Sequence, residues 1–534
     1  MAKKKAASFV KGALILAVAS ILVKVIGAVF RIPLTNLVGT YTMGLYSYAY
    51  RYYSILLTIA TAGIPIAISK MVSESRALGR PRETGKIFRT AMGLCISIGL
   101  VGTLLLMSAS GFLAEKVIKD LNVIPSIIAL SPAVLFMAVT AGFRGYFQGH
   151  ENMVPTALSQ IIEALSRLLV GLALAYLLLH YGFAEKYISA GVILGITIGT
   201  VLTVILMVAL LMRKRIVEGR LPDEGGECRS TSTILGAILA IAVPVTLGSL
   251  VMNLTTTIDS VLIPIRLSSL GYDSVETTTM YSIYDNYALP LFNLVPQIII
   301  SLNVSVTPTI SAAHAVKDYE KLSKTILSAL RIVVIFTLPA AVGISVLSKP
   351  VLSILYTSAS DVAVAAPILT VLGLASFFLC ASSLTSTSMQ ALGRAELPLI
   401  TMAVGAAVKI AANYFLIPIP GIELMGAAIG TVLCYIVITV LNMILLRRVA
   451  KFCPPLGETF IRPLISCAIM GAVVWGIYNL SVPFVGNLVS VAASIMLGVI
   501  VYFAAMILLR GITKEDITGI PKGEKIAKLI FKDK

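Results

Sequence analysis

Residues 188–212 read ISAGVILGITIGTVLTVILMVALLM and contain no charged side chain. A helix needs about 20 consecutive apolar residues to cross the roughly 30 Å hydrocarbon core of a bilayer. Lipid offers no hydrogen-bond partner to a peptide group, so such a segment must satisfy its backbone internally, as an α-helix does. The stretch therefore predicts a transmembrane helix.

Apolar runs of this kind recur along the whole chain. They predict an all-α polytopic membrane protein with about fourteen transmembrane helices. The predicted spans are residues 11–30, 44–66, 88–111, 124–143, 156–179, 188–212, 234–256, 279–302, 327–347, 363–385, 399–418, 424–446, 463–480 and 487–509.

The composition agrees with a membrane protein and argues against a soluble enzyme. The 534 residues are 58% hydrophobic and 13% charged, and the mean hydropathy is +0.96. Soluble domains are roughly 45–50% apolar and about 25% charged. The six cysteines form no CxxC pair and the three histidines are scattered. We therefore expect no enzyme, no cofactor and no metal site.

Basic residues set the predicted orientation. Most of the 42 Lys and Arg residues fall in the two tails and the even-numbered junctions between spans, which indicates that these parts face the cytoplasm. The chain is thus predicted to cross the plasma membrane many times with both termini in the cytoplasm. This topology accounts for the net charge of +17 without nucleic acid as a partner. The basic end of the chain either lies on the anionic inner leaflet or is solvated.

The chain contains an internal repeat. Residues 66–69 (IAIS) resemble residues 308–311 (PTIS). Gly149 corresponds to Gly393, which follows it at nearly the same distance in sequence. An even number of helices in each copy predicts two parallel six-helix lobes, with a substrate passing between them by alternating access. The predicted domains are an N-lobe at 1–222, a C-lobe at 223–450, two further helices at 451–510 and a basic cytosolic tail at 511–534.

Cations inside the predicted spans are the main functional candidates. Lys24 and Arg31 are seven residues, or two helical turns, apart on the first span. Arg51 lies in the second span, and Arg266 lies at the outer end of the seventh. Because a charge at mid-bilayer costs roughly 2.5–3.5 kcal/mol on insertion scales, such residues usually face a cavity or a partner. They predict a cationic cavity for an anionic substrate; the alternative is that they pair with carboxylates or extend to the headgroups.

Two further spacings predict packing within the membrane. Glu163 and Arg167 are four residues apart on the fifth span, which favours an ion pair. Gly191, Gly195 and Gly199 recur every fourth residue, which lets another helix of the same chain approach closely.

Three stretches carry a family resemblance: residues 63–70 (GIPIAISK), 143–156 (FRGYFQGHENMVPT) and 416–431 (LIPIPGIELMGAAIGT). They resemble the polysaccharide-exporter branch of the multidrug/oligosaccharidyl-lipid/polysaccharide (MOP) flippase superfamily. Within that branch the chain is similar to the stage V sporulation protein B group and the related lipid II flippases, over nearly its whole length.

The resemblance implies two lobes around a central cationic cavity and flipping of an undecaprenyl-pyrophosphate-linked sugar. Lys24 and Arg31 fall where the lipid II flippases have essential cations. The sequence departs from the better-known flippases at two places that bear on the identity of the cargo. Ile32 follows Arg31 where the flippases have an Asp, and residues 284–287 lack the Arg that the flippases have there. The implied partners are a lipid-linked anionic sugar, the membrane and cell-wall synthesis proteins, with the chain itself a monomer.

The resemblance also implies an ion-coupling site. The flippases can hold sodium between helices seven, eleven and twelve, and Asp259, Asn413 and Thr431 fall near the ligand positions. Lys409 lies one turn before Asn413, where a neutral ligand is expected. We therefore expect the Lys409 ammonium to replace sodium and pair with Asp259. The resemblance leaves three driving forces for transport as alternatives: a sodium gradient, a proton gradient and the membrane potential.

Two other functions remain as alternatives to lipid flipping. A multidrug or cation antiporter needs acidic residues in its cavity, whereas the first-lobe spans offer mainly Lys24, Arg51 and a paired Glu163. A non-transporting scaffold of a cell-wall complex would not need the cavity charges at all.

Overall fold

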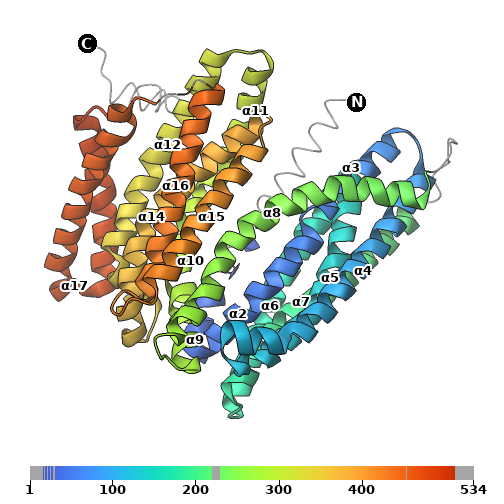
Figure 1. Cartoon of the computed structure of the whole chain (residues 1–534), viewed down its shortest axis with the longest axis horizontal. Helices are drawn as coiled ribbons and strands as arrows, with labels where there is room; N and C mark the ends of the chain where they lie inside the picture. The colour runs from blue at the N-terminus through green and yellow to red at the C-terminus, as the bar shows by residue number, and fades with distance from the viewer. Residues whose placement is uncertain are drawn as a thin grey trace. The chain divides into compact units, whose positions relative to one another are not determined.

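The computed structural model describes residues 16, 19–20, 22–23, 26–27, 30–218, 229–450, 452 and 454–511. Lys24 and the basic tail from 512 onward lie outside these residues. All regular secondary structure in the described ranges is helical (Figure 1). The predicted all-α class is confirmed.

The chain forms two compact units, residues 1–282 and 283–534. Residues 30–38 of the first unit are helical and end at Gly39. The further helices of this unit are α2 (Thr40–Thr61), α3 (Ile64–Ala77), α4 (Pro81–Phe112), the π-helical turn η1 (Leu113–Ile118), the 3-10 turn η2 (Leu121–Val123), α5 (Ile124–Gly149), α6 (Val154–His180), α7 (Glu185–Glu218), α8 (Thr231–Ser268) and α9 (Ser274–Ser282).

The second unit begins with a π-helical turn and ends with two antiparallel helical segments. Its helices are η3 (Ile283–Ala288), α10 (Leu289–Phe292), α11 (Leu294–Ala315), α12 (Tyr319–Val346), α13 (Ser348–Leu355), α14 (Ala359–Ala391), α15 (Glu396–Leu416), α16 (Leu424–Ala450), η4 (Gly457–Ile461) and α17 (Arg462–Leu508). The two units meet at residues 282/283, whereas the internal repeat predicts a lobe boundary at 222/223. The boundary from the repeat stays a prediction.

Eleven helical stretches within the described residues are long and apolar enough to cross a membrane. One of them, Gly457–Leu508, has 52 residues and contains the two predicted C-terminal spans. At 1.5 Å per residue it is far too long for one crossing. It breaks at Gly486, whose φ of 75° is left-handed, and Gly498 then packs against Val474 of the same element. The first predicted span lies mostly outside the described residues.

The predicted eighth span, 279–302, is not one regular helix. The chain there is divided into α9, η3, α10 and α11. Pro290 lacks an N–H and its ring excludes a helical bond to the carbonyl of Asn286, four residues earlier. That carbonyl instead accepts a hydrogen bond of 2.6 Å from the Tyr356 hydroxyl. A side chain 70 residues away in the sequence thus satisfies the carbonyl that Pro290 leaves free within this span.

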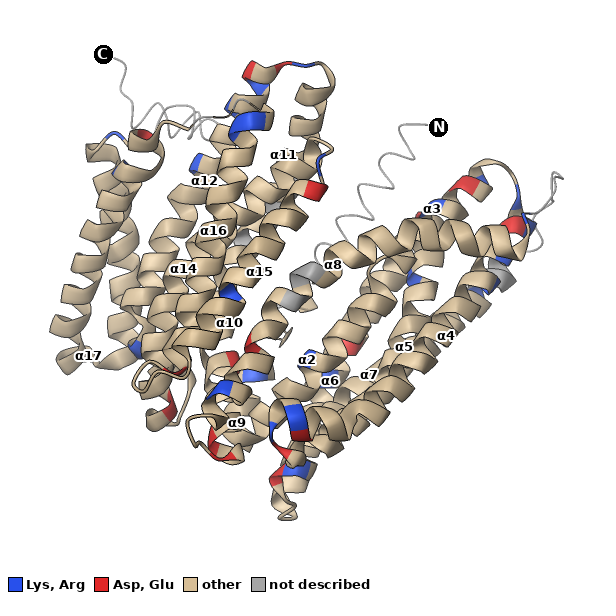
Figure 2. Ribbon diagram, in the orientation of Figure 1, with Lys and Arg blue, Asp and Glu red and all other residues tan. Residues whose placement is uncertain are grey.

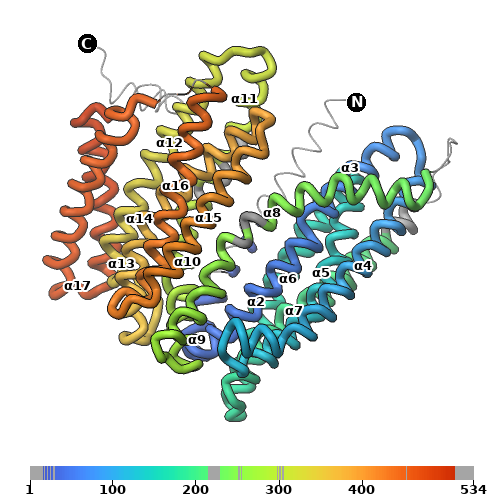
Figure 3. Tube along the Cα trace, viewed as in Figure 1, coloured from blue at the N-terminus to red at the C-terminus, as the bar shows by residue number. Residues whose placement is uncertain are grey.

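Glycines allow close helix packing in the first unit. A methyl group at Gly195 on α7 would come within 2.7 Å of the Gly171 nitrogen on α6, and one at Gly199 within 2.9 Å of Ser166 Cβ. The predicted glycine-mediated contact is therefore confirmed, and its partner is α6. Figure 3 traces α8, which contacts α2, α3, α4 and α9 of the same unit.

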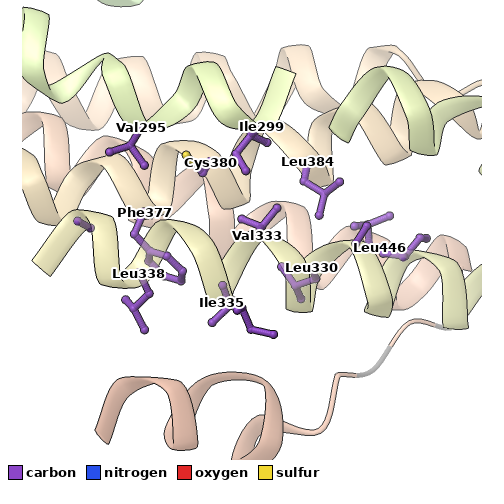
Figure 4. Close-up of a cluster of buried hydrophobic side chains, with 14 of the residues drawn as sticks. Val295, Ile299, Leu330, Val333, Ile335, Leu338, Phe377, Cys380, Leu384 and Leu446 are labelled. Atoms are coloured by element: carbon purple, nitrogen blue, oxygen red, sulfur yellow. The ribbon is translucent and has the colours of Figure 1, made fainter. Parts of the chain in front are cut away.

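The second unit has its own apolar core. Val295 and Ile299 of α11, Leu330 and Val333 of α12, and Cys380 of α14 are all buried there (Figure 4). Charged residues lie mainly near helix ends, and the helix bodies are largely uncharged (Figure 2). The few charges within the helix bodies are therefore the features that need a functional explanation.

Candidate functional site

The cations predicted for substrate binding lie in the first unit, as far as the structure describes them. Arg31 is on the helical segment 30–38, Arg51 on α2 and Arg266 on α8, and each is partly buried. The carbonyl of Arg31 accepts a hydrogen bond from Thr35, and that of Arg51 accepts one from Ser54. Lys24 lies outside the described residues.

Two contacts fix the register between α2 and α8. Asn253 on α8 donates a hydrogen bond to Thr58 on α2, and Tyr52 lies against Ser260. The two helices are therefore antiparallel, and Asp259 lies at the level of Arg51. Asp259 is 4% exposed. The buried carboxylate of Asp259 therefore lies at the same height along the α2–α8 pair as Arg51, a predicted substrate cation. Both residues belong to the first unit.

The other predicted ion-coupling residues form a buried cluster in the second unit. Lys409 and Asn413 lie one turn apart on α15, and Thr431 is on the adjacent helix α16. All three are buried. The Asn413 side-chain oxygen lies against Gly430, and the Thr431 hydroxyl is 3.2 Å from that of Tyr284. All three residues therefore lie on one pair of neighbouring helices, and their role in ion coupling stays a prediction.

Tyr284 belongs to the π-helical turn η3, a class of element often found at functional sites. Its neighbours Asp285 and Asn286 are also buried. Tyr287 of the same turn donates a hydrogen bond of 3.1 Å to Asp361 and stacks on Tyr356 at 4.0 Å. The sequence did not single out Tyr284 as a site residue, although the Pro290 break that follows is a usable signal.

The first unit contains a third polar cluster. Glu163 on α6 lies between two arginines: its carboxylate is 3.4 Å from Arg167 and 3.5 Å from Arg144. The predicted Glu163–Arg167 pair is confirmed. Arg144, on α5, was assigned from the sequence to a cytoplasmic junction, and its place in this cluster was missed. The guanidinium of Arg167 also lies 5.3 Å from the ring centre of Tyr50, a cation–π contact.

Two family models and several known proteins match this chain. The family described as "Polysaccharide biosynthesis protein" matches residues 9–314, and the MatE family matches residues 284–415. Stage V sporulation protein B of Bacillus subtilis (strain 168) is 24% identical over 516 residues, covering 96% of this chain and 98% of that protein. Lipid II flippase MurJ of the same organism is 25% identical over 486 residues, covering 87% of each chain.

A solved structure, "Lipid II flippase MurJ, inward closed conformation", has the same fold. Its TM-score is 0.69 at 17% identity, and the match covers 93% of this chain and 99% of that one. The fold and its buried charges define a multi-pass membrane transporter rather than an enzyme. The chain belongs to the polysaccharide biosynthesis protein family and is a flippase-like transporter of the MOP superfamily, close to stage V sporulation protein B and MurJ.

Proposed function

We propose that this protein moves an undecaprenyl-pyrophosphate-linked cell-wall precursor, similar to lipid II, across the plasma membrane by alternating access. The product would serve peptidoglycan or spore cortex synthesis. The names of two relatives, a lipid II flippase and a stage V sporulation protein, support this class of cargo. A polyprenyl tail can stay in the bilayer while the diphosphate crosses, so the protein must stabilise mainly the anionic group.

The observation that carries the proposal is the set of arginines on membrane helices of the first unit. Arg31, Arg51 and Arg266 are partly buried on three separate helical segments. Guanidinium groups match phosphate oxygens in a bidentate geometry. Even when the carboxylate of Asp259 is counted against the three arginines, the described set keeps an excess of positive charge. That sign suits a diphosphate and opposes a cationic drug.

We assign ion coupling to Asp259, Lys409, Asn413 and Thr431. A buried ammonium within a membrane needs compensating groups, and Lys409 has Asn413 one turn away for this purpose. The expected pairing of Lys409 with Asp259 stays a prediction. Lys409→Ala should abolish transport at low sodium, with partial rescue by added sodium. Strict dependence of the wild-type protein on sodium would contradict the assignment.

A second candidate function is drug or cation antiport, which the MatE match over residues 284–415 favours. A third is a non-transporting scaffold for cell-wall proteins. Depletion of the protein in its source organism separates the three. Flipping predicts that one lipid-linked precursor accumulates on the inner leaflet, as measured by leaflet-specific labelling and mass spectrometry. Antiport predicts increased drug sensitivity with normal precursor levels. A scaffold predicts that variants lacking Arg31, Arg51 or Arg266 restore normal growth to the depleted strain.

A further inference from the structure

Arg144, Gln160, Glu163 and Arg167 line a cavity of about 350 Å³ inside the first unit. We call it the Arg144–Arg167 pocket. Its other walls are mostly apolar and come mainly from α2, α5 and the described part of the first helix, including Phe30, Leu57 and Met137, with the hydroxyl side chains of Ser20 and Thr61 among them. The pocket is therefore a polar site between membrane-spanning helices of one unit.

The charges in this pocket do not balance. Two guanidinium groups face a single carboxylate, which leaves these three side chains with one excess positive charge. The side chains of Arg144, Glu163 and Arg167 are only 14%, 16% and 22% exposed. A charge held away from water is costly unless a counter-charge accompanies it. The excess therefore favours an anion in the pocket.

The existing contacts also leave hydrogen-bonding capacity unused. The two ion pairs, at 3.4 and 3.5 Å, are longer than the roughly 2.7–2.9 Å of strong charge-assisted hydrogen bonds. Among the described residues, Arg144 Nη2, Arg167 Nε and Gln160 Oε1 have no hydrogen-bond partner. The nearby Tyr53 hydroxyl is buried and has none either. Such buried polar atoms need an explanation, and a bound ligand is one.

One contact already orients Arg144. Its Nε donates a hydrogen bond of 2.9 Å to the Ser159 hydroxyl, which in turn donates one of 2.6 Å to the Thr156 carbonyl. Arg167 is oriented by the ring of Tyr50. Both guanidinium groups are thus held in place, which lowers the entropy lost when a ligand binds.

We propose that the Arg144–Arg167 pocket binds a phosphate oxyanion between the two guanidinium groups, with Glu163 as the competing carboxylate. The cavity is much larger than a bare halide needs, and the planar donor forks match oxyanion geometry. The side-chain amide nitrogen of Gln160, which lines the pocket, can add a neutral donor for a remaining oxygen. None of Arg31, Arg51 and Arg266 lines this pocket, and the proposal goes beyond the proposed function. The phosphate can come from a polyprenyl diphosphate in the membrane or from a soluble phosphate.

The test is binding of inorganic phosphate to the full-length protein in nanodiscs, measured by equilibrium dialysis at constant ionic strength. Arg167→Gln should weaken binding about tenfold or more, because a charged donor is lost. Glu163→Gln should tighten it several-fold, because the internal competitor is removed. The two substitutions should thus change the phosphate affinity in opposite directions. If Arg167 and Glu163 had only a structural role, both substitutions would be expected to act in the same direction. The matched control is Arg394→Gln, which removes an exposed arginine outside the pocket and should leave phosphate binding unchanged.

A second arm identifies the source of the phosphate. Undecaprenyl diphosphate in the nanodisc should displace bound inorganic phosphate if the lipid is the ligand, whereas retained phosphate assigns the site to a soluble anion. The proposal is overturned if neither anion binds, or if Glu163→Gln fails to tighten binding. Glu163→Gln decides the question even if Arg167→Gln does not fold. A failure here with intact lipid flipping leaves the proposed function in place.

Discussion

Asn413 and Gly430 show how one residue in the second unit depends on another across a helix pair. Gly430 on α16 lies directly against the side-chain oxygen of Asn413 on α15. Both Asn413 and the adjacent Thr431 are fully or almost fully buried. The absence of a side chain at Gly430 is therefore what lets the Asn413 carboxamide occupy its position beside Thr431.

Gly430→Ala should displace Asn413 and impair transport. The added methyl group would overlap the carboxamide oxygen, and overpacking of this kind costs about 1–3 kcal/mol. The measurement is complementation of a depletion strain together with thermal unfolding of the purified protein. Gly236→Ala is the matched control, because Gly236 on α8 has nothing within 4 Å. Wild-type transport and stability in Gly430→Ala would contradict the tight contact.

At the scale of elements, the two N-terminal family stretches pack on each other. Gly145 of the second stretch lies on α5, and a methyl group there would come within 2.8 Å of both Ile68 Cβ and the Pro65 carbonyl of the first. One at Gly149 would come within 2.6 Å of Val72 Cβ. The small-xxx-small spacing thus brings α5 against α3, and this packing holds the α5 helix that carries Arg144.

Gly145→Val should separate α3 from α5. The larger side chain meets backbone as well as side-chain atoms, so we expect a loss of about 1–3 kcal/mol in stability and lower abundance in the membrane. The readouts are the melting temperature and the amount of folded protein by fluorescence-detected size exclusion. Gly93→Val serves as the control, since Gly93 on α4 is exposed and has nothing within 4 Å. Equal behaviour of the two variants would contradict the close approach.

The sequence predicted the helical elements well because hydrophobic length and helix are coupled in a membrane. It did not reveal which group satisfies the carbonyl that Pro290 leaves free, because the Tyr356 hydroxyl that does so is distant in sequence. The same reason explains the polar sites. Glu163 and Arg167 are on one helix at a diagnostic spacing, whereas Arg144 reaches Glu163 from another helix. Local spacing reveals pairs within an element, and only the fold reveals the third partner.

For the whole molecule, the distribution of basic residues predicts that both termini face the cytoplasm. An alkaline phosphatase fused after Gly182, between α6 and α7, should be active because that junction lies outside. A fusion at the C-terminus should be inactive, and green fluorescent protein at the same place should fluoresce. An active C-terminal phosphatase would reverse the proposed orientation.

The predicted monomeric state is checked on the purified protein by size-exclusion light scattering.

We propose that arginines on the first unit carry the diphosphate of a lipid-linked sugar across the membrane. The most direct measurement is flipping of fluorescent lipid II in proteoliposomes that contain the purified full-length protein. We predict flipping by the wild type and a loss of at least tenfold in Arg31→Gln and Arg51→Gln, at equal levels of folded protein. Exposed Arg394→Gln should match the wild type. Undiminished flipping in both arginine variants, or export of cationic dyes with no lipid flipping by the wild type, would rule out this role of the arginines.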